Sequence, residues 1–364
     1  MTRVLAVNTG SSSLKLAVVA DDDSVVAEEK IADWDGSTDP LRDFVAAAEV
    51  DAVGHRFVHG GPDLHEPVEI DAAVEYRLQE AATFAPLHQP RALDALAAVR
   101  ELCPDLPHVA CLDTAFHRHL PEAAAHYALP WEWTERWHLR RYGFHGLSHE
   151  YAATRTAEIL GRDVSELRTV VCHLGSGASL CAVDRGRSVD TTMGLTPTEG
   201  LVMGTRPGNV DPGLLLWLLT EQGITPAELD EAVTRRSGLL GLSGLSADLE
   251  DVVEAAHDGD ARSERAVNVY LHRLTTLVGA MAAAMKGLDA VCFTGGVGEN
   301  SSLVRQATAD ALAWAGMEVD RSRNAETTTD RDISVSGAGV RTVVVTARED
   351  LAIARHTRQA LQLR

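Results

Sequence analysis

The chain has 364 residues, a length that suggests two domains of ordinary size rather than one. Hydrophobic residues make up 45% of it and charged residues 24%, which is the balance of a soluble globular protein. The formal net charge of −20 at pH 7 argues against nucleic acid and membrane as partners, because an acidic surface repels phosphate groups.

Three strands are predicted at the start of the chain, over residues 3–8, 14–20 and 24–30. The first two are apolar runs separated by the turn Asn8-Thr9-Gly10 and three serines, which is typical of a hairpin. A second hairpin is predicted over residues 169–174 and 178–184. The segments VLAVNTGSSSLKLAVV and VVCHLGSGASLCAV look alike and predict a repeat of domain scale, with chance likeness of two hairpins as the alternative.

Helices are predicted where apolar residues recur at helical spacing, over residues 91–102, 265–286 and 302–315. Gly287 is the expected C-cap of the second of these helices. The polar stretch 321–332 is expected to be a surface loop. Strands and helices alternate in both halves, so the fold class is predicted to be α/β.

The cysteines are odd in number and include no Cys-x-x-Cys pair, so we expect free, buried thiols in a reducing compartment. The N-terminus lacks the apolar core of a signal peptide, and no apolar run approaches the length of a membrane span. A cytoplasmic protein is therefore expected. The cysteines are Cys103, Cys111, Cys172, Cys181 and Cys292.

Three glycine-rich turns follow predicted strands, at residues 8–13, 175–177 and 294–300. Glycine lets backbone N–H groups approach an anion closely, and the third turn leads into a helix whose N-terminus also favours phosphate. Each turn alone is more often structural, but three in one chain suggest a nucleotide. The chain has no GxxxxGK[ST] run and no early GxGxxG, which disfavours P-loop and Rossmann enzymes.

Two arginines lie beside glycine turns, Arg56 in HRFVHGG and Arg206 in MGTRPG. A guanidinium held in this way suits planar recognition of phosphate or carboxylate, although an ordinary surface arginine is the alternative for each. Asp113 and Glu349 are carboxylates that could hold Mg²⁺, which needs few protein oxygens. The sequence alone does not select them from the many other acids.

Histidines are dense between residues 117 and 149. His145 follows Gly143 at a predicted bend, where it could donate a hydrogen bond to developing charge. A core histidine bonded to a carbonyl is the alternative, and a zinc site is disfavoured because no Glu-x-x-His context or cysteine ligand accompanies the histidines.

Trp131, Trp133 and Trp137 alternate with arginines in the segment 131–141. Aromatics interleaved with arginines can stack bases. Because the chain is so acidic, a packed hinge region is the preferred interpretation.

The chain resembles the acetate kinase family along nearly its whole length. The motifs that carry this resemblance are collinear and highly specific: NTGSSSLK (8–15), HRFVHGG (55–61), APLHQP (85–90), LDTAFH (112–117), YGFHGLSH (142–149), HLGSGAS (173–179), DTTMGLTPTEGLVMGTRPGNVDPG (190–213), SGLLGLSG (237–244), FTGGVGENS (293–301) and REDLAIARHT (348–357).

The resemblance implies two RNase-H-like α/β domains of the kind found in actin, sugar kinases and heat-shock ATPases, with the active site in the cleft between them. The expected bounds are 1–114 with the C-terminal helix 350–364, and 115–349 for a second domain that binds nucleotide and dimerises. It implies reversible phosphoryl transfer from ATP to acetate, giving acetyl phosphate and ADP, with Mg²⁺ or Mn²⁺ as cofactor. A homodimer is implied in the same way.

Site residues follow from the positions that match the family motifs. The resemblance implies four catalytic residues, Asp113, His145, Arg206 and Arg56. It implies an acyl site made by Arg56, Val58, Leu87, Phe144 and Pro197. It places the nucleotide at Lys15, His173, Gly175, Ser176, Gly177, Asp248, Gly295, Gly296, Val297, Gly298 and Asn300. It assigns the metal to Asn8 and Glu349, places Asn8 and its neighbouring serines at the transferred phosphoryl group, and puts His88 and His173 near the phosphate path.

The chain departs from the family pattern at three positions. Ser176 stands where asparagine is usual, Glu250 where an arginine beside the adenine is usual, and Asn209 where aspartate is usual. Two of these lie on the nucleotide side, so GTP and pyrophosphate remain alternatives to ATP. Propionate or butyrate kinase is the alternative within enzymes, and a non-catalytic actin-like nucleotide switch is the alternative outside them.

Overall fold

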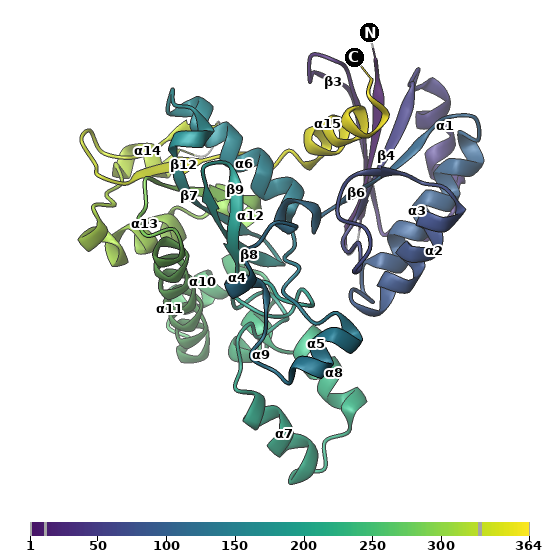
Figure 1. The fold of residues 1–364 in the computed structure, drawn as a ribbon. Helices are drawn as coiled ribbons and strands as arrows, with labels where there is room; N and C mark the ends of the chain where they lie inside the picture. Colours follow the sequence, from purple (N-terminus) through teal and green to yellow (C-terminus); the bar gives the residue numbers. More distant parts are fainter. Residues whose placement is uncertain (1, 11–12, 327–329, 364) are drawn as a thin grey trace. The chain divides into compact units, whose positions relative to one another are not determined.

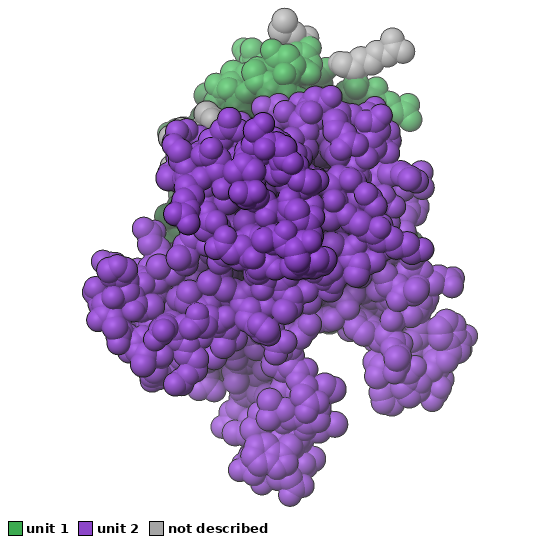
Figure 2. Space-filling model, turned by 90° about the vertical axis from the view of Figure 1, so that its left-hand side faces the viewer, with its two compact units in different colours: residues 1–118, 144–151, 348–364 green, residues 119–143, 152–347 purple. Residues whose placement is uncertain are grey.

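The computed structural model describes residues 2–10, 13–326 and 330–363 (Figure 1). The chain divides into two compact units (Figure 2). Unit 1 comprises Met1–Arg118, Phe144–Tyr151 and Arg348–Arg364, and unit 2 comprises His119–Gly143 and Ala152–Ala347. These units differ from the expected domain bounds chiefly in Phe144–Tyr151, which groups with the N-terminal part of the chain.

Unit 1 is built on a six-stranded sheet in the order β3-β2-β1-β4-β6-β5. Strands β1, β4 and β6 are parallel, whereas β2, β3 and β5 each run antiparallel to their neighbours. The three parallel strands read as nearly continuous apolar runs because both faces of the sheet are covered. The strands are β1 (Val4–Thr9), β2 (Ser13–Val19), β3 (Val25–Ala32), β4 (Ala52–Phe57), β5 (Val68–Glu69) and β6 (His108–Leu112).

Helices cover both faces of this sheet (Figure 1). Leu5 and Val7 of β1 join a core with the helices on one face, whereas Val4 and Ala6 pack with the C-terminal helix on the other. This alternation follows from the two-residue period of a strand. The helices are α1 (Asp39–Ala47), α2 (Ala72–Glu80), α3 (Gln89–Leu102) and α15 (Glu349–Leu361), with short 3₁₀ turns η1 (Ala81–Thr83) and η2 (Ala115–His117).

Unit 2 repeats the same sheet with the order β11-β12-β10-β7-β8-β9. Here β7, β10 and β12 are parallel, and the other three strands pair antiparallel. The predicted hairpin repeat is confirmed, since β1–β2 and β7–β8 hold equivalent places in two sheets of one topology. The strands are β7 (Arg168–Leu174), β8 (Ala178–Asp184), β9 (Arg187–Thr191), β10 (Ala290–Thr294), β11 (Arg331–Asp332) and β12 (Arg341–Val344).

The longest helix of unit 2, α11 (Ala261–Ala284), packs against β7, β8 and β9. Helix α6 (Gly146–Ile159) begins in unit 1 and ends in unit 2. The other elements of unit 2 are α4 (Glu122–Ala125), α5 (Trp131–Trp137), η3 (Val164–Glu166), α7 (Pro212–Thr220), α8 (Pro226–Arg235), α9 (Gly238–Ser243), α10 (Leu249–His257), α12 (Gly295–Asn300), α13 (Ser302–Ala311), η4 (Ala313–Ala315) and α14 (Arg321–Ala325).

The surface loop expected over 321–332 is partly wrong. Residues Arg321–Ala325 form α14, because the Asp320 carboxylate accepts hydrogen bonds from the N–H groups of Ser322 and Arg323. Residues Arg331–Asp332 pair with β12, and residues 327–329 lie outside the described part of the chain.

The expected C-cap at Gly287 is also wrong. Helix α11 ends at Ala284, and the left-handed residue after it is Lys286, with φ of 56°. Gly287 instead donates its N–H to the carbonyl of Ala282 over 3.1 Å, and its φ of 155° is one that other residues rarely adopt.

The tryptophans of the segment 131–141 do not form a packed hinge. Trp131 is 60% exposed, Trp133 is 43% exposed and Trp137 is 46% exposed. Helix α5, which carries all three, buries none of its residues.

The expectation about thiols is confirmed. All five cysteines are free, and four of them are buried, with Cys103 half-buried. Among the helices of the described residues, none is long and apolar enough to cross a membrane.

Candidate active site

Three neighbouring parallel strands of unit 1 each end at a predicted site residue. Asn8 lies near the end of β1, Arg56 near the end of β4, and Asp113 directly after β6. The carboxyl ends of parallel strands meet at one edge of a sheet, which is where α/β proteins place their ligand sites. Glu349, the first residue of α15, completes this group.

Arg56 is the centre of this group and is surrounded by oxygen. Its Nη2 lies 2.7 Å from Oδ2 of Asp113 and its Nε 3.1 Å from Oδ1, so the contact is bidentate. Its Nη1 lies 3.1 Å from Oε2 of Glu349 and 3.1 Å from Oδ1 of Asn8. Burial alone would lower the pKa of Arg56, but the carboxylates of Asp113 and Glu349 outweigh it and raise this pKa.

The metal residues expected from the sequence lie in contact with each other. The Asn8 amide donates to Oε2 of Glu349 over 2.7 Å, so this oxygen faces both the amide and Arg56. The amide oxygen of Asn8 and the carboxylates of Glu349 and Asp113 are hard donors of the kind that Mg²⁺ takes, and Mg²⁺ requires only one or two of them. The donor set therefore fits a magnesium ion.

Asp113 also shapes the turn that carries His145. Its carboxylate accepts the backbone N–H of His145, and its carbonyl accepts the N–H of Gly146 over 2.9 Å. A Cβ at Gly146 would lie 2.1 Å from that carbonyl oxygen, so only glycine fits. His145 itself has φ of 57°, a left-handed conformation that a non-glycine residue adopts only when its surroundings hold it. Asp113 therefore links the orientation of Arg56 to the backbone of His145.

The residues expected to bind the acyl group divide between the units. Val58 and Phe144 are buried in unit 1, Leu87 is half-buried there, and Pro197 is half-buried in unit 2. The ring of His59 stacks on Phe84 at 4.8 Å and meets Phe144 edge-on at 5.4 Å between centroids. His59 thus packs beside Phe144 and follows Val58 in the chain.

Gln89 is a fully buried polar residue that the sequence analysis missed. Its amide donates 2.8 Å to the carbonyl of His59, and its oxygen accepts the N–H of the same residue over 3.2 Å. It holds the chain next to Val58 as a neighbouring strand would. The signal in the sequence was its position in the APLHQP motif, where a glutamine follows His88 at the start of α3.

Lys15 is exposed and lies directly opposite Asn8 in the register of β1 and β2. The hairpin therefore brings this lysine beside the end of β1. Ser11 and Ser12, two of the serines expected at the phosphoryl group, lie outside the described residues.

In unit 2, two of the predicted glycine turns lie next to each other. His173 at the end of β7 pairs with Thr294 at the end of β10, so the 175–177 turn and α12 follow neighbouring parallel strands. Gly175 closes the first turn by donating 3.1 Å to the carbonyl of Gly177, and Ser176 at its tip is exposed.

The second turn requires glycine at its first position. Gly295 has φ of 78°, and a Cβ there would lie 2.7 Å from the carbonyl oxygen of Leu174. Beyond it, Gly296 is exposed, Val297 is half-buried and Gly298 is buried, while the Asn300 amide donates 2.8 Å to the carbonyl of Gly296.

Arg305 supports this turn from within the protein and was also missed. It is 1% exposed, and its guanidinium donates to the carbonyls of Gly298 and Glu299 and to Asn324. All these acceptors are neutral, and burial lowers the pKa of Arg305 to about 10. The sequence gave no signal for it, because a buried arginine without a carboxylate has no local pattern.

Asp248 lies on the exposed N-terminus of α10. Its carboxylate accepts the N–H of Glu250 over 2.9 Å and caps the helix. Glu250, which departs from the family pattern, is exposed in the first turn of the same helix.

Arg206 differs from Arg56 in its surroundings. Its Nη1 donates to the carbonyl oxygen of Pro197, and no carboxylate of the described residues lies within ion-pair distance of it. Burial lowers the pKa of Arg206 to about 10. The guanidinium is therefore desolvated without a compensating negative charge, which is the condition in which it gains most from an anion.

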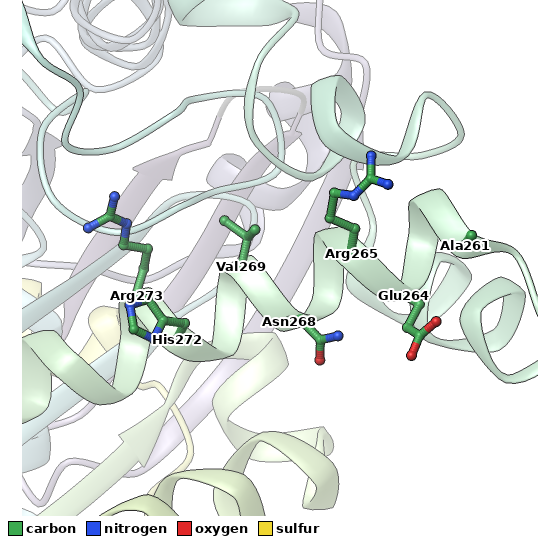
Figure 3. Close-up of a pocket in the computed structure, with 7 residues that line it drawn as sticks. All are labelled: Ala261, Glu264, Arg265, Asn268, Val269, His272 and Arg273. Atoms are coloured by element: carbon green, nitrogen blue, oxygen red, sulfur yellow. The ribbon is translucent and has the colours of Figure 1, made fainter.

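Helix α11 lines a pocket in unit 2. Figure 3 shows its lining side chains along one face of α11, none of them a predicted site residue: Ala261, Glu264, Arg265, Asn268, Val269, His272 and Arg273.

The family profile described as the Acetokinase family matches residues 41–355 of the chain. The chain belongs to this family. Among curated relatives, an acetate kinase from a Cyanothece species is 44% identical over 350 residues, covering 96% of this chain and 85% of the relative. One from a Synechococcus species is 49% identical over 316 residues, covering 87% and 78%.

Two solved structures agree with the fold throughout. The acetate kinase of Porphyromonas gingivalis is 35% identical, with a TM-score of 0.90 and coverage of 99% of this chain and 100% of that chain. A propionate kinase from Francisella tularensis subsp. tularensis is 32% identical, with a TM-score of 0.90 and the same coverage. Together with the two matching sheet topologies, they confirm the predicted α/β fold class.

Proposed function

We propose that this protein is an acetate kinase, which transfers a phosphoryl group reversibly between ATP and acetate. The observation that carries the proposal is the cluster at the strand ends of unit 1, in a chain of the acetokinase family. Asn8, Arg56, Asp113 and Glu349 form one bonded group there, with His145 held beside it by Asp113.

These residues suit the chemistry of phosphoryl transfer to acetate. Acetate is already ionised at neutral pH, so the reaction needs no general base to activate it. An acetate oxygen attacks the γ-phosphorus of ATP, the bond from that phosphorus to the bridging oxygen breaks, and ADP leaves with the electron pair. The main difficulty is that two anions must meet, so positioned cations and hydrogen-bond donors should supply most of the catalysis.

Each group has a role in this proposal. Arg56 and Arg206 bind carboxylate and phosphoryl oxygens, and His145 donates a hydrogen bond to the phosphoryl group as charge develops. Asp113 orients Arg56 and the His145 turn. Asn8 and Glu349 would hold Mg²⁺ (or Mn²⁺), which when bound neutralises charge on the phosphate oxygens.

The nucleotide is assigned to the second set of residues. The turn from Gly295 to Asn300 and the 175–177 turn offer backbone N–H groups after neighbouring strands, with His173 at the end of β7. Lys15 from unit 1 and Asp248 complete the set. Ser176 and Glu250 depart from the family pattern in the nucleotide site. We therefore propose ATP as the first phosphoryl donor to test, followed by pyrophosphate and GTP.

Propionate is the second candidate acceptor, because a propionate kinase is among the similar structures. Val58, Leu87, Phe144 and Pro197 are assigned to the methyl group. One additional methylene changes discrimination by only ~1–3 kcal/mol, so the preference is one of degree.

A hydroxamate assay tests the function directly. Purified protein is incubated with ATP, Mg²⁺ and acetate, and acyl phosphate is trapped as the hydroxamate. We expect turnover with acetate, weaker turnover with propionate and less again with butyrate. Absence of acyl phosphate with any pairing of ATP, GTP or pyrophosphate with these acids would refute the proposal and favour a non-catalytic nucleotide switch.

The family resemblance adds a homodimer to the proposal, and the cytoplasmic location expected from the sequence stays part of it. Sedimentation equilibrium of the purified chain tests the first, with twice the 39.1 kDa chain mass as the expected result.

A further inference from the structure

The loop between β9 and α7 carries two predicted site residues, Pro197 of the acyl site and the catalytic Arg206. Pro197 lies in it, and its carbonyl accepts a hydrogen bond from Arg206. Among the described residues, this carbonyl is the hydrogen-bond acceptor of the Arg206 side chain. The direction of this guanidinium therefore depends on where the Pro197 carbonyl is held.

Glu199, two residues after Pro197, is bound on both carboxylate oxygens. Arg141 donates to its Oε1 over 2.7 Å, and the Tyr127 hydroxyl donates to its Oε2 over 2.8 Å. The Arg141 guanidinium also lies 5.7 Å from the centre of the Tyr127 ring. These three side chains, named here the Glu199 clamp, all belong to unit 2.

The Glu199 clamp also holds the backbone before Pro197. The Tyr127 hydroxyl accepts the N–H of Leu195 over 2.9 Å, and Arg141 donates to the carbonyl of Thr192 over 3.1 Å. Gly194 passes so close that a Cβ would lie 1.9 Å from Glu199 and 2.0 Å from Tyr127. The loop is therefore fixed on the N-terminal side of Pro197 by hydrogen bonds to Leu195 and Thr192, with Gly194 packed against the ends of Glu199 and Tyr127.

The C-terminal side of the loop is fixed by Asn209. Its side-chain oxygen accepts the N–H of Gly200 over 2.9 Å, and its own N–H donates to the carbonyl of Gly200 over 3.0 Å. Asparagine thus retains the acceptor that the usual aspartate would supply at this position. Pro197 lies between two anchored points.

We propose that Glu199 is a positioning residue for Arg206, acting through the Pro197 carbonyl. This inference rests on the proposed function. The side chain of Glu199 is 34% exposed and that of Arg141 is 17% exposed, and ion pairs with this much solvent contact contribute little to stability. The Glu199 clamp instead fixes the direction of the Arg206 guanidinium, which no carboxylate contacts within the described part of the chain.

The test is a double-mutant cycle between Glu199→Ala and Arg206→Met. We expect Glu199→Ala to lower kcat/KM for acetate by roughly 10- to 100-fold, the range for a misplaced catalytic group, with KM for ATP changed less than about twofold. In the Arg206→Met background the same substitution should cause no further loss, because the group it positions is gone. Glu199→Gln should recover part of the loss, since its amide oxygen can still accept from Arg141.

Asp289→Ala is the matched control. It removes an ion pair of similar exposure in the same unit, in which Arg168 lies 2.9 Å from Asp289, and it should leave kcat/KM for acetate unchanged. Equal losses for Glu199→Ala and Asp289→Ala, or a full additional loss in the Arg206→Met background, would overturn the inference.

Hydrogen exchange separates this inference from the proposed function. The Leu195 amide should exchange faster in Glu199→Ala than in the wild type, whether or not the protein forms acyl phosphate. An inactive wild type with unchanged Leu195 protection in the variant would overturn both ideas. An inactive wild type with faster exchange would overturn only the function and support the Glu199 clamp.

Discussion

The two units surround their proposed site arginines in opposite ways. Arg56 in unit 1 contacts the carboxylates of Asp113 and Glu349, and its pKa is raised. Arg206 in unit 2 contacts the carbonyl of Pro197, and burial lowers its pKa to about 10. Both residues lie beside glycine in similar motifs, so sequence alone would treat them alike.

The difference suggests a division of roles. The charge of Arg56 is compensated before any substrate arrives, so its geometry is fixed in advance and it can present a rigid donor. The charge of Arg206 is desolvated and uncompensated, so an incoming anion would improve its environment. We therefore expect Arg56 to support the fold as well as the reaction, and Arg206 to serve the reaction alone.

Stability should show the largest contrast. Replacing Arg56 by Met leaves Asp113, whose side chain is 1% exposed, as a buried carboxylate without its cation. Breaking such a pair costs roughly 3–5 kcal/mol of unfolding free energy. Arg206→Met removes a desolvated charge that no carboxylate compensates among the described residues, so it should not lower the unfolding free energy. Urea unfolding of both variants measures the unfolding free energy. Equal losses in the two variants would contradict the proposed difference between Arg56 and Arg206.

Turnover should show no such contrast. Arg56→Ala and Arg206→Ala should each lower turnover at least ~100-fold, which corresponds to about 2.7 kcal/mol, because each removes a donor to developing charge. Rates are compared at equal concentrations of folded protein. The urea unfolding described above gives the folded fraction of each variant. Lysine at either position should recover little, because an ammonium lacks the planar fork. Near-wild-type turnover in either alanine variant would refute its assignment.

Local patterns predicted much of the fold. The strand runs at 3–8 and 169–174 could be read because both faces of their sheets are buried, and the hairpins because each turn needs glycine or serine. Two errors came from caps: α14 depends on Asp320, and the helix before Gly287 ends with a left-handed lysine that its composition does not signal.

Local motifs suggested candidates such as Arg56, Arg206 and His145, but only the family resemblance selected them from their alternatives. Asn8 and Glu349 are in contact although 341 positions separate them in the chain, and no local pattern reports such a distance. Gln89, Arg305 and Glu199 were missed for the same reason, since each supports the site through backbone groups that a sequence does not display. The exposed tryptophans of α5 were misjudged because packing was inferred from the acidity of the chain, and net charge does not report the burial of a single side chain.

The smallest expected effect extends the comparison from arginine to histidine. Unit 1 also buries His117, whose Nε2 bonds the carbonyl of Phe144 over 3.1 Å. Burial lowers the pKa of His117 from 6.5 to about 4, even though Phe144 and Glu150 act to raise it. A histidine can accept burial by remaining neutral, whereas an arginine such as Arg206 cannot lose its proton.

The sign of the pH effect follows from this lowered pKa. The unfolded chain binds a proton at His117 below pH 6.5, and the folded chain does so only near pH 4, so acid favours unfolding in this window. The stability contributed by His117 is present above pH 6.5 and falls as the pH drops towards 4. Between pH 7 and pH 5 this single group should cost about 2 kcal/mol of unfolding free energy.

Unfolding free energies at pH 7 and pH 5 test this for His117→Gln against wild type. The variant should lose about 2 kcal/mol less than the wild type between the two pH values, whatever its stability at pH 7. His119→Gln makes the same change at an exposed position two residues away, and it should lose as much unfolding free energy between the two pH values as the wild type. Arg206→Met should also lose as much as the wild type, because the charge of Arg206 does not change in this pH range. If His117→Gln lost as much unfolding free energy as the wild type between pH 7 and pH 5, His117 would not be held neutral by burial. If Arg206→Met lost less than the wild type, the two units would not differ as described.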